Sequence, residues 1–252
     1  MKKMLIVFCA LALISAVASA QSKSLRSSAA QPNVQAPQPA YCAPCLFYSG
    51  DFDPNNAVAN ALFNANTTFG EGQAYVAIAP AVTTSTNKHG VVKVSKTATV
   101  TQLVFNEFAT GLSDFTGSTY DIRTDLAAGY GGTEVKTGTC ASSSATATGR
   151  TAFSLNEYSF SCTFAGVALK AGTEYWVNVT PNFNDGDYAY LSDSEDQPPL
   201  NAFNSGDGGL WGNVGDGSYF QGPATFGVTW GEAANIGDYG MDEFSIAVVG
   251  TY

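Results

Sequence analysis

The side chains best suited to bind a ligand lie in one long segment, from Pro181 to Pro223, that is rich in acidic and aromatic residues. Asp185, Asp187 and Asp193 offer carboxylate oxygens, which calcium takes as ligands in flexible acidic loops. Their spacing follows no fixed calcium motif, and the same residue types are common in solvated turns. The segment therefore predicts either a calcium site built on these three aspartates or a set of ordinary turns.

Aromatic side chains in the same segment indicate a second kind of ligand, a carbohydrate. Tyr188 and Tyr190 have polar neighbours, and Trp211 stands in a glycine-rich stretch. Sugar rings stack on exposed aromatic faces, so these three residues are the expected glycan contacts. Trp176 and Trp230 lie in strand-like sequence instead, and we expect them in the core.

Enzymatic chemistry finds little support in the sequence. The single histidine, His89, cannot build a multi-histidine metal site. The sequence has no G-x-S-x-G nucleophile motif, no P-loop and no dinucleotide-binding fingerprint. A glycosidase needs only two carboxylates, but among 21 acidic residues no pattern selects a pair. We therefore expect a non-enzymatic protein that binds a surface, glycan or matrix component. The alternative is a carbohydrate-active hydrolase that uses an acidic pair.

Charge is distributed very unevenly along the chain. Residues 171–252 hold twelve Asp and Glu and no Lys or Arg, whereas residues 41–170 hold nine acids and seven bases. An acidic half of this kind repels nucleic acid and anionic membranes, so neither is an expected partner. It can attract divalent cations, or it can simply keep the protein in solution. The bases available to offset it across the fold are Lys88, Lys93, Lys96 and Arg123.

The first twenty residues have the pattern of a bacterial export signal. Lys2 and Lys3 precede an apolar run, and Ala18, Ser19 and Ala20 form a small-residue cleavage site. The run is too short to span a bilayer as a mature helix, and no later stretch is long and apolar enough to do so. We therefore expect a secreted, extracellular protein without a transmembrane segment after signal cleavage.

The rest of the chain divides into a short linker and one domain. Residues 21–40 are rich in Gln, Pro, Ser and Ala, which is typical of a flexible stalk. Residues 41–252 have the length of a single all-β domain that can bury its own core. The expected organisation is thus a signal peptide at 1–20, a linker at 21–40 and a domain at 41–252.

Four cysteines follow the signal, and an even count in an exported chain predicts disulfides. Cys140 and Cys162 lie symmetrically about Thr151, in a segment whose pattern is strand, turn at 148–151, strand. An antiparallel hairpin centred there would place the two cysteines opposite each other, at a separation that a disulfide can bridge. Of the three pairings that four cysteines allow, local geometry therefore favours Cys140 with Cys162.

This pairing leaves Cys42 with Cys45, which have two residues between them. A C-x-x-C pair also occurs in thioredoxin-like redox sites, where a strand precedes it and a helix follows it. Here a Pro-rich segment precedes the pair and a Leu-Phe-Tyr-Ser-Gly segment follows it. A structural disulfide is therefore the favoured interpretation, and redox chemistry is the alternative.

Alternation of apolar and polar residues predicts that the domain consists of β-strands. In Glu174 to Thr180, for example, Tyr175, Val177 and Val179 share one face. Gly, Asn and Asp clusters separate such segments, and Asn55 to Asn64 alone has a weak helical pattern. We therefore expect an all-β, jelly-roll-like sandwich of antiparallel strands. The other expected strands are Thr97–Phe105, Ser118–Arg123, Tyr158–Phe164, Thr225–Trp230 and Phe244–Val249.

Four motifs, taken in order, resemble a group of exported proteins. They are Leu46 to Asn56, Thr148 to Phe153, Asn156 to Tyr158 and Leu169 to Trp176. Together they resemble uncharacterised secreted proteins of acidobacteria-like bacteria, which are similar in style to choice-of-anchor β-sandwich modules. The resemblance covers most of residues 46–180 and implies a jelly-roll-like sandwich outside the cell. It implies no catalytic residues. Such modules often carry a sorting tail, which this sequence lacks, and the 140–162 cysteine pair is expected to be a local addition.

Overall fold

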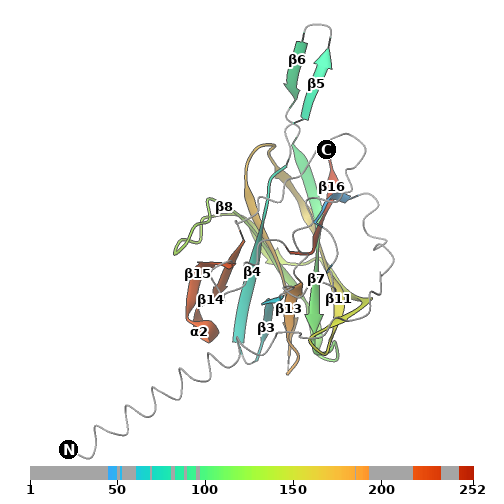
Figure 1. Ribbon diagram of the computed structural model, residues 1–252, viewed down its shortest axis with the longest axis vertical. Helices are drawn as coiled ribbons and strands as arrows, with labels where there is room; N and C mark the ends of the chain where they lie inside the picture. The colour runs from blue at the N-terminus through green and yellow to red at the C-terminus, as the bar shows by residue number, and fades with distance from the viewer. Residues whose placement is uncertain are drawn as a thin grey trace, which may run out of the picture.

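The structure is a computed structural model, and it describes ten stretches of the chain (Figure 1). These are residues 45–49, 52, 61–68, 70–80, 83–87, 90–94, 97–184, 186–192, 218–233 and 244–252. Almost all of their regular structure is strand, arranged in two seven-stranded sheets and one separate hairpin. The expected all-β sandwich is therefore confirmed.

The first sheet, sheet A, is built on two long central strands, β7 and β11. Its main path runs in the order β1-β16-β7-β11-β10, and β13 pairs with both β7 and β2. The bounds are β1 Cys45–Tyr48, β2 Ala61–Phe63, β7 Ala98–Ala109, β10 Ser142–Ala152, β11 Leu155–Leu169, β13 Ala189–Ser192 and β16 Ile246–Thr251.

The second sheet, sheet B, packs against sheet A and follows the order β15-β14-β4-β3-β12-β8-β9. Its bounds are β3 Ala65–Thr67, β4 Gly70–Ile78, β8 Phe115–Thr124, β9 Thr133–Thr139, β12 Tyr175–Phe183, β14 Tyr219–Gly222 and β15 Val228–Glu232. The pairing of β3 with β12 is parallel, whereas the other strand pairs of the two sheets are antiparallel. The expected antiparallel arrangement thus holds for these sheets except at this one pairing.

The strands expected from alternation are present, with one exception. Thr225 and Phe226 belong to a short helical turn, α2 (Pro223–Phe226), and the strand β15 begins only at Val228. Pro223 occupies the first turn of α2, where its missing N–H is not needed, and Gly227 ends the turn in the left-handed conformation. The weak helical pattern of Asn55 to Asn64 was also misleading, because Ala61–Phe63 form β2.

The core lies between the inner faces of the two sheets. Val177 and Val179 of β12 meet Leu103 and Phe105 of β7, and all four side chains are fully buried. The opposite face of β12 is buried too. There Trp176 packs in a smaller cluster with residues that include Trp230. Both tryptophans are therefore core residues, as predicted.

One chain segment connects the two sheets by belonging to both. β2 pairs with β13 in sheet A, and β3, which follows after the single residue Asn64, pairs with β4 and β12 in sheet B. Asn64 lies at the crossing and is fully buried. β4 pairs directly with β12 around Val177 and separates from it where β3 enters.

The side chain of Asn64 replaces backbone pairing at this fork. Its Oδ1 accepts from the backbone N of Ala74 (3.1 Å), and its Nδ2 donates to the carbonyl of Val179 (2.7 Å). Asn178 completes the set by donating from Nδ2 to Asn64 Oδ1 (2.9 Å) and to the carbonyl of Ala74 (2.7 Å). Buried backbone groups left over by the separating strands are thus satisfied by amides.

Cys140 and Cys162 form a disulfide, as predicted, but for a different geometric reason. The β10–β11 turn lies at Phe153 and Ser154, both with positive φ, rather than at 148–151. Cys162 pairs across the hairpin with Ser143, whereas the backbone N of Cys140 bonds the carbonyl of Ser118 in sheet B. The disulfide therefore joins the two sheets. Cys42 lies outside the described residues, so the Cys42–Cys45 pairing stays a prediction.

The segment from Pro181 to Pro223 is more regular than the sequence indicated. β12 extends to Phe183, and two short strands, β13 and β14, lie within the segment. Residues 193–217 lie outside the described part of the chain. Among the described residues, no helix is long and apolar enough to cross a membrane.

Candidate functional site

Four partly exposed aromatic side chains form a continuous row where β13, β2 and α2 meet. Ring centroids are 5.4 Å apart from Tyr188 to Tyr190, 5.6 Å from Tyr190 to Phe63 and 5.1 Å from Phe63 to Phe226. Tyr188, Tyr190 and Phe63 are half-buried, and Phe226 is 39% exposed. We call these four residues the aromatic row. It includes both tyrosines that the sequence singled out as glycan contacts.

Two glycines make room for the outer half of the row. A Cβ on Gly72 of β4 would lie 2.5 Å from Cδ1 of Phe63, and a Cβ on Gly222 would lie 2.7 Å from Cδ2 of Phe226. Both distances are shorter than real carbon–carbon contacts allow, so any larger residue would displace a ring. The exposed position of Phe226 therefore depends on local sequence, since α2 turns the chain and Gly222 leaves space for the ring.

Asp187 lies beside this row and is held by the β7–β8 turn. Its Oδ1 accepts from Thr110 Oγ1 (3.1 Å), and its Oδ2 accepts from Ser113 Oγ (3.1 Å). A Cβ on Gly111 would lie 3.0 Å from both carboxylate oxygens, so the turn closes tightly around the carboxyl group. Thr110 Oγ1 also accepts from the backbone N of Tyr188 (3.0 Å), which links the turn to the aromatic row.

The electrostatics of this end of the fold keep Asp187 ionised and Tyr190 neutral. Burial acts to raise the pKa of Asp187, but hydrogen bonds from Asp114, Thr110 and Ser113 outweigh it and hold that pKa below its ordinary value. Burial and the neighbouring Tyr188 raise the pKa of Tyr190 to about 12. A ligand at this end would therefore meet the carboxylate of Asp187 and the neutral phenol group of Tyr190.

The other predicted site residues are not brought to this place by the described structure. Asp185, Asp193 and Trp211 lie outside the described residues, and so does His89. Over the parts of the chain that the structure places, no three His, Cys, Asp or Glu side chains form a group suited to a metal ion. Calcium binding by Asp185, Asp187 and Asp193 therefore stays a prediction, with only Asp187 placed.

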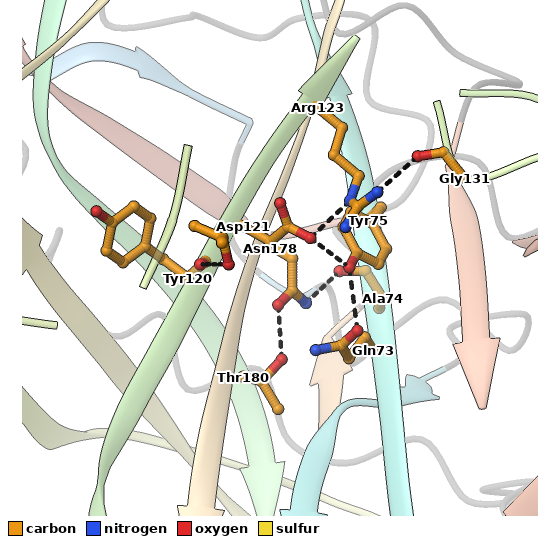
Figure 2. Close-up of polar contacts among 10 residues, drawn as sticks. Gln73, Ala74, Tyr75, Tyr120, Asp121, Arg123, Gly131, Asn178 and Thr180 are labelled. Carbon is orange, nitrogen blue, oxygen red and sulfur yellow. Dashed lines mark hydrogen bonds and ion pairs between the residues drawn. The ribbon is translucent and has the colours of Figure 1, made fainter. Parts of the chain in front are cut away.

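A second polar cluster, which the sequence did not predict, covers the outer face of sheet B (Figure 2). Asp121 Oδ2 accepts from Nε of Arg123 (2.6 Å) and lies 2.9 Å from the hydroxyl of Tyr75. Arg123 also donates from Nη1 to the carbonyl of Gly131 (2.9 Å), and its guanidinium lies 5.0 Å from the ring of Trp230. The cluster thus fastens the β8–β9 loop onto the sheet.

The charges in this cluster stabilise one another. Burial acts to lower the pKa of Arg123, but the contacts with Asp121 outweigh it, so the net shift is upward. Burial and the nearby Asp121 raise the pKa of Tyr75 well above its ordinary value. The signal for this pair was present in the sequence, because alternation places Asp121 and Arg123 on one face of the same strand. Nothing in the sequence placed Tyr75 opposite them.

Two carboxyl groups are fully buried and too deep to meet a ligand. Glu107 of β7 faces the core, and Glu157 of β11 lies on the outer face of sheet A; both are 0% exposed. Burial raises the pKa of each side chain. Two of the 21 acidic residues are therefore part of the protein interior.

Comparison of the chain with protein-family models, curated proteins and solved structures finds no match in any of the three. The resemblance to exported choice-of-anchor-like modules therefore rests on its sequence motifs alone. The functional argument rests on the aromatic row and its surroundings.

Proposed function

We propose that this protein is a secreted, non-enzymatic module that binds a glycan through the aromatic row. The observation that carries the proposal is the contiguity of Tyr188, Tyr190, Phe63 and Phe226 at one place on the surface. Single exposed apolar side chains are normal, but a contiguous set of apolar side chains that reaches the surface is typical of an interaction site. Sugar rings have apolar C–H faces that suit aromatic partners.

The angles between the rings favour an oligosaccharide over a single sugar. Tyr188 and Tyr190 meet at 88°, and Tyr190 and Phe63 meet at 84°. Two adjacent rings at such angles cannot both present a face in the same direction. A single sugar ring can therefore stack on only one ring of each such pair, and a ligand that stacks on two rings of the row must contain more than one sugar unit.

Polar groups beside the row supply the hydrogen bonds that a sugar requires. Asp187 offers carboxylate oxygens, and Thr110 and Ser113 bring hydroxyls to the same turn. Binding sites for small ligands combine apolar walls with a few such fixed polar groups. The Asp187 carboxylate also offers oxygen atoms of the kind that calcium takes as ligands, so calcium is proposed as an accompanying ligand.

The location follows from the sequence rather than from the fold. The N-terminal pattern supports export through a cleaved signal peptide, and a jelly-roll-like sandwich is the fold expected of such extracellular modules. The Cys140–Cys162 disulfide supports an oxidising compartment, because disulfides persist there and are rare in the cytosol.

A glycan array, run with and without calcium and paired with a hydrolysis assay, tests the proposal. We expect binding without release of sugar. Substituting Tyr188→Ala or Phe226→Ala should weaken binding roughly two- to tenfold per ring. Tyr130→Ala is the matched control, because Tyr130 is a 56% exposed tyrosine outside the row.

Three results would contradict the proposal in different ways. Binding that Tyr188→Ala and Tyr130→Ala reduce equally would show that the row is not the site. Hydrolysis of a bound glycan would favour the alternative, a carbohydrate-active hydrolase with an acidic pair. Failure to bind any glycan in either condition would remove the glycan proposal itself.

A further inference from the structure

One end of the aromatic row lies next to an ionised carboxyl group. The hydroxyl of Thr110 connects the two, because it donates to Asp187 Oδ1 (3.1 Å) and accepts from the backbone N of Tyr188 (3.0 Å). Asp187 is held by hydroxyl groups rather than by a cation, since the salt bridges found among the described residues involve other acids. A ligand on the ring of Tyr188 therefore meets a negative charge that protein hydroxyls alone stabilise.

The other end of the row, at Phe226, also lies near an acidic residue. Thr225 precedes Phe226 in α2, and its Oγ1 accepts from the backbone N of Glu71 in β4 (3.2 Å). Glu71 is exposed. A ligand that extends along the whole row thus reaches an acidic residue at each end.

The four Lys and Arg side chains that the structure describes are either remote from the row or already paired. Arg123 and Lys136 lie near the end of β8 that is far from the β7–β8 turn. Lys170 follows β11 where that strand pairs with the start of β7, whereas β13 pairs with the last residues of β7. Arg150 is buried and forms a salt bridge with Glu157. No described basic side chain is therefore placed to bind an anion at the row.

The separate hairpin of β5 (Thr83–Asn87) and β6 (Gly90–Val94) is also distant from the row. Its strands pair only with each other, and Figure 1 shows the hairpin at the end of the sandwich opposite β13 and α2. Lys93 is a residue of β6. We expected Lys93 to offset acidic residues across the sandwich, but its strand joins neither large sheet.

We propose that the glycan bound by the aromatic row is an oligomer of amino sugars, with a protonated amine at the carboxylate of Asp187. This inference rests on the proposed function. An ammonium group is attracted both by a carboxylate and by the faces of aromatic rings. A neutral sugar gains the stacking alone, and a uronic acid is repelled by the carboxylate. Asp187 is therefore the residue that selects the class of glycan.

Isothermal titration calorimetry of the purified protein with three β-1,4-linked sugar hexamers tests the inference. The hexamers of glucosamine, N-acetylglucosamine and glucose differ only in the group at carbon 2, which is an ammonium, an acetamide or a hydroxyl. At about pH 5.5 the amine is charged, and Asp187 is ionised because its pKa lies below the ordinary value. With a chelator present, we expect the glucosamine hexamer to bind about two- to fivefold more tightly than the glucose hexamer. High salt should reduce this preference.

Substitution of Asp187 separates recognition of the amine from binding to the rings. Asp187→Asn should lower the affinity for the glucosamine hexamer more than that for the glucose hexamer, and so remove the preference. Glu134→Gln is the matched control, because Glu134 is an exposed acid of β9 that pairs with Arg123, far from the row. Tyr188→Ala should weaken both hexamers alike. Adding calcium should weaken the glucosamine hexamer alone, because calcium and the amine compete for one carboxylate.

The outcomes that overturn this inference are distinct from failure of the proposed function. Equal affinity for the glucosamine and glucose hexamers overturns it, and so does tightest binding of the N-acetylglucosamine hexamer. Equal loss of the preference in Asp187→Asn and Glu134→Gln would mean that overall charge attracts the amine. Tighter binding of a galacturonic acid hexamer than of the glucose hexamer would assign the row to acidic glycans. In these four cases the row still binds a glycan, whereas binding of none of the hexamers contradicts the proposed function as well.

Discussion

Two buried glutamates on neighbouring strands are stabilised in opposite ways. Glu107 of β7 pairs across the ladder with Tyr158, the residue next to Glu157 of β11, so the two carboxyl groups lie on opposite faces of sheet A. Glu107 accepts one hydrogen bond, from Asn64 Nδ2 (2.8 Å), and its Oε2 has no partner. Glu157 accepts from Arg150, from Thr148 Oγ1 (2.7 Å) and from Ser192 Oγ (2.8 Å).

A buried carboxyl group needs either partners for its negative charge or a proton. Burial raises the pKa of Glu157 on balance, but a guanidinium and two hydroxyls oppose that rise and stabilise the carboxylate form. Glu107 has one amide partner, and burial raises its pKa well above the ordinary value, so the neutral acid is favoured there. A charge without a countercharge is expensive to bury, whereas a protonated acid behaves like an amide.

The largest expected effect comes from removing the countercharge of Glu157. Arg150→Met leaves a fully buried carboxylate unpaired, and we expect it to lower the free energy of unfolding by about 3–5 kcal/mol. The double variant Arg150→Met with Glu157→Gln removes the charge as well and should recover much of the loss. Urea denaturation monitored by circular dichroism measures both. An equal loss in the single and double variants would contradict a charge-based role for the pair.

The disulfide on β11 provides a stabilisation that does not depend on charge. Changing Cys140 and Cys162 together to Ser releases a closed segment with a sequence separation of 22 residues. We expect a loss of roughly 3 kcal/mol and a melting temperature lower by several degrees. The loss should be the same at pH 5 and pH 8. A strongly pH-dependent difference from the wild type would mean that the link also shapes the neighbouring polar groups.

The buried carboxyl group of Glu107 should make the stability of the protein depend on pH. Its folded-state pKa is raised above the ordinary value of 4.5, so the folded state holds its proton longer than the unfolded chain does. Its contribution is fully present below pH 4.5 and is lost as pH rises towards the folded-state pKa, at up to about 1.4 kcal/mol per pH unit.

Glu107→Gln keeps an amide-like group and has no proton to lose. Its stability should match the wild type at pH 4 and exceed it increasingly as pH rises. Thermal melts from pH 4 to pH 8 measure the difference. Parallel curves for the two proteins would show that Glu107 does not titrate differently on folding.

A smaller effect is expected at the exposed counterpart of the buried ion pair. The side chains of Arg123 and Asp121 are 21% and 8% exposed, against 4% and 0% for Arg150 and Glu157. Arg123→Lys keeps the charge but loses the planar contact with Trp230 and the bond to Gly131. We expect a cost of up to about 1 kcal/mol. Arg150→Lys is the matched substitution and should cost more. If Arg123→Lys destabilised the protein more than Arg150→Lys, burial of the ion pair would not determine the cost of the substitution.

The smallest expected effect concerns Asp187, whose carboxylate is held at the surface by hydroxyls. If calcium binds there with a dissociation constant near 1 mM, adding 1 mM calcium should stabilise by about 0.4 kcal/mol, or about 1–2 °C in melting temperature. Sodium chloride of equal ionic strength is the control. Changing Asp185, Asp187 and Asp193 together to Asn should remove the difference. Equal shifts of the melting temperature in the two salts would mean that charge screening, and not bound calcium, causes the stabilisation.

Local patterns predicted the strands well and the cross-connections poorly. Alternation located β7, β8, β11, β12 and β16, because each of these strands has faces in distinct environments. It could not find the point where the chain passes from one sheet to the other, since Asn64 lies between two three-residue strands that are too short to give a periodic signal. The disulfide was predicted from a hairpin with its turn at 148–151, whereas the turn lies at Phe153 and Ser154. The cysteine pairing was therefore correct, although the strand register used to predict it was not.

The sequence predicted two of the four residues of the aromatic row. Tyr188 and Tyr190 stand out because polar residues surround them. Phe63 and Phe226 look like ordinary core residues, and only the tertiary fold brings them to the same surface from positions more than a hundred residues apart. Buried acids such as Glu157 are equally hidden, because a carboxylate in a strand is usually on a solvated face.

The chain segment around Asn64, which passes from sheet A to sheet B, also limits how fast the protein can fold. Its side chain bonds Val179 and Asn178, which are 115 and 114 residues away along the chain. Closing loops of that size costs entropy before any contact compensates for it, so these pairings form late. Until they do, β12 lacks its pairing with β3 and β13 lacks its pairing with β2, so one edge of each strand can pair with other chains. Refolding should therefore be slow, on the order of milliseconds to seconds, and its yield should fall as protein concentration rises.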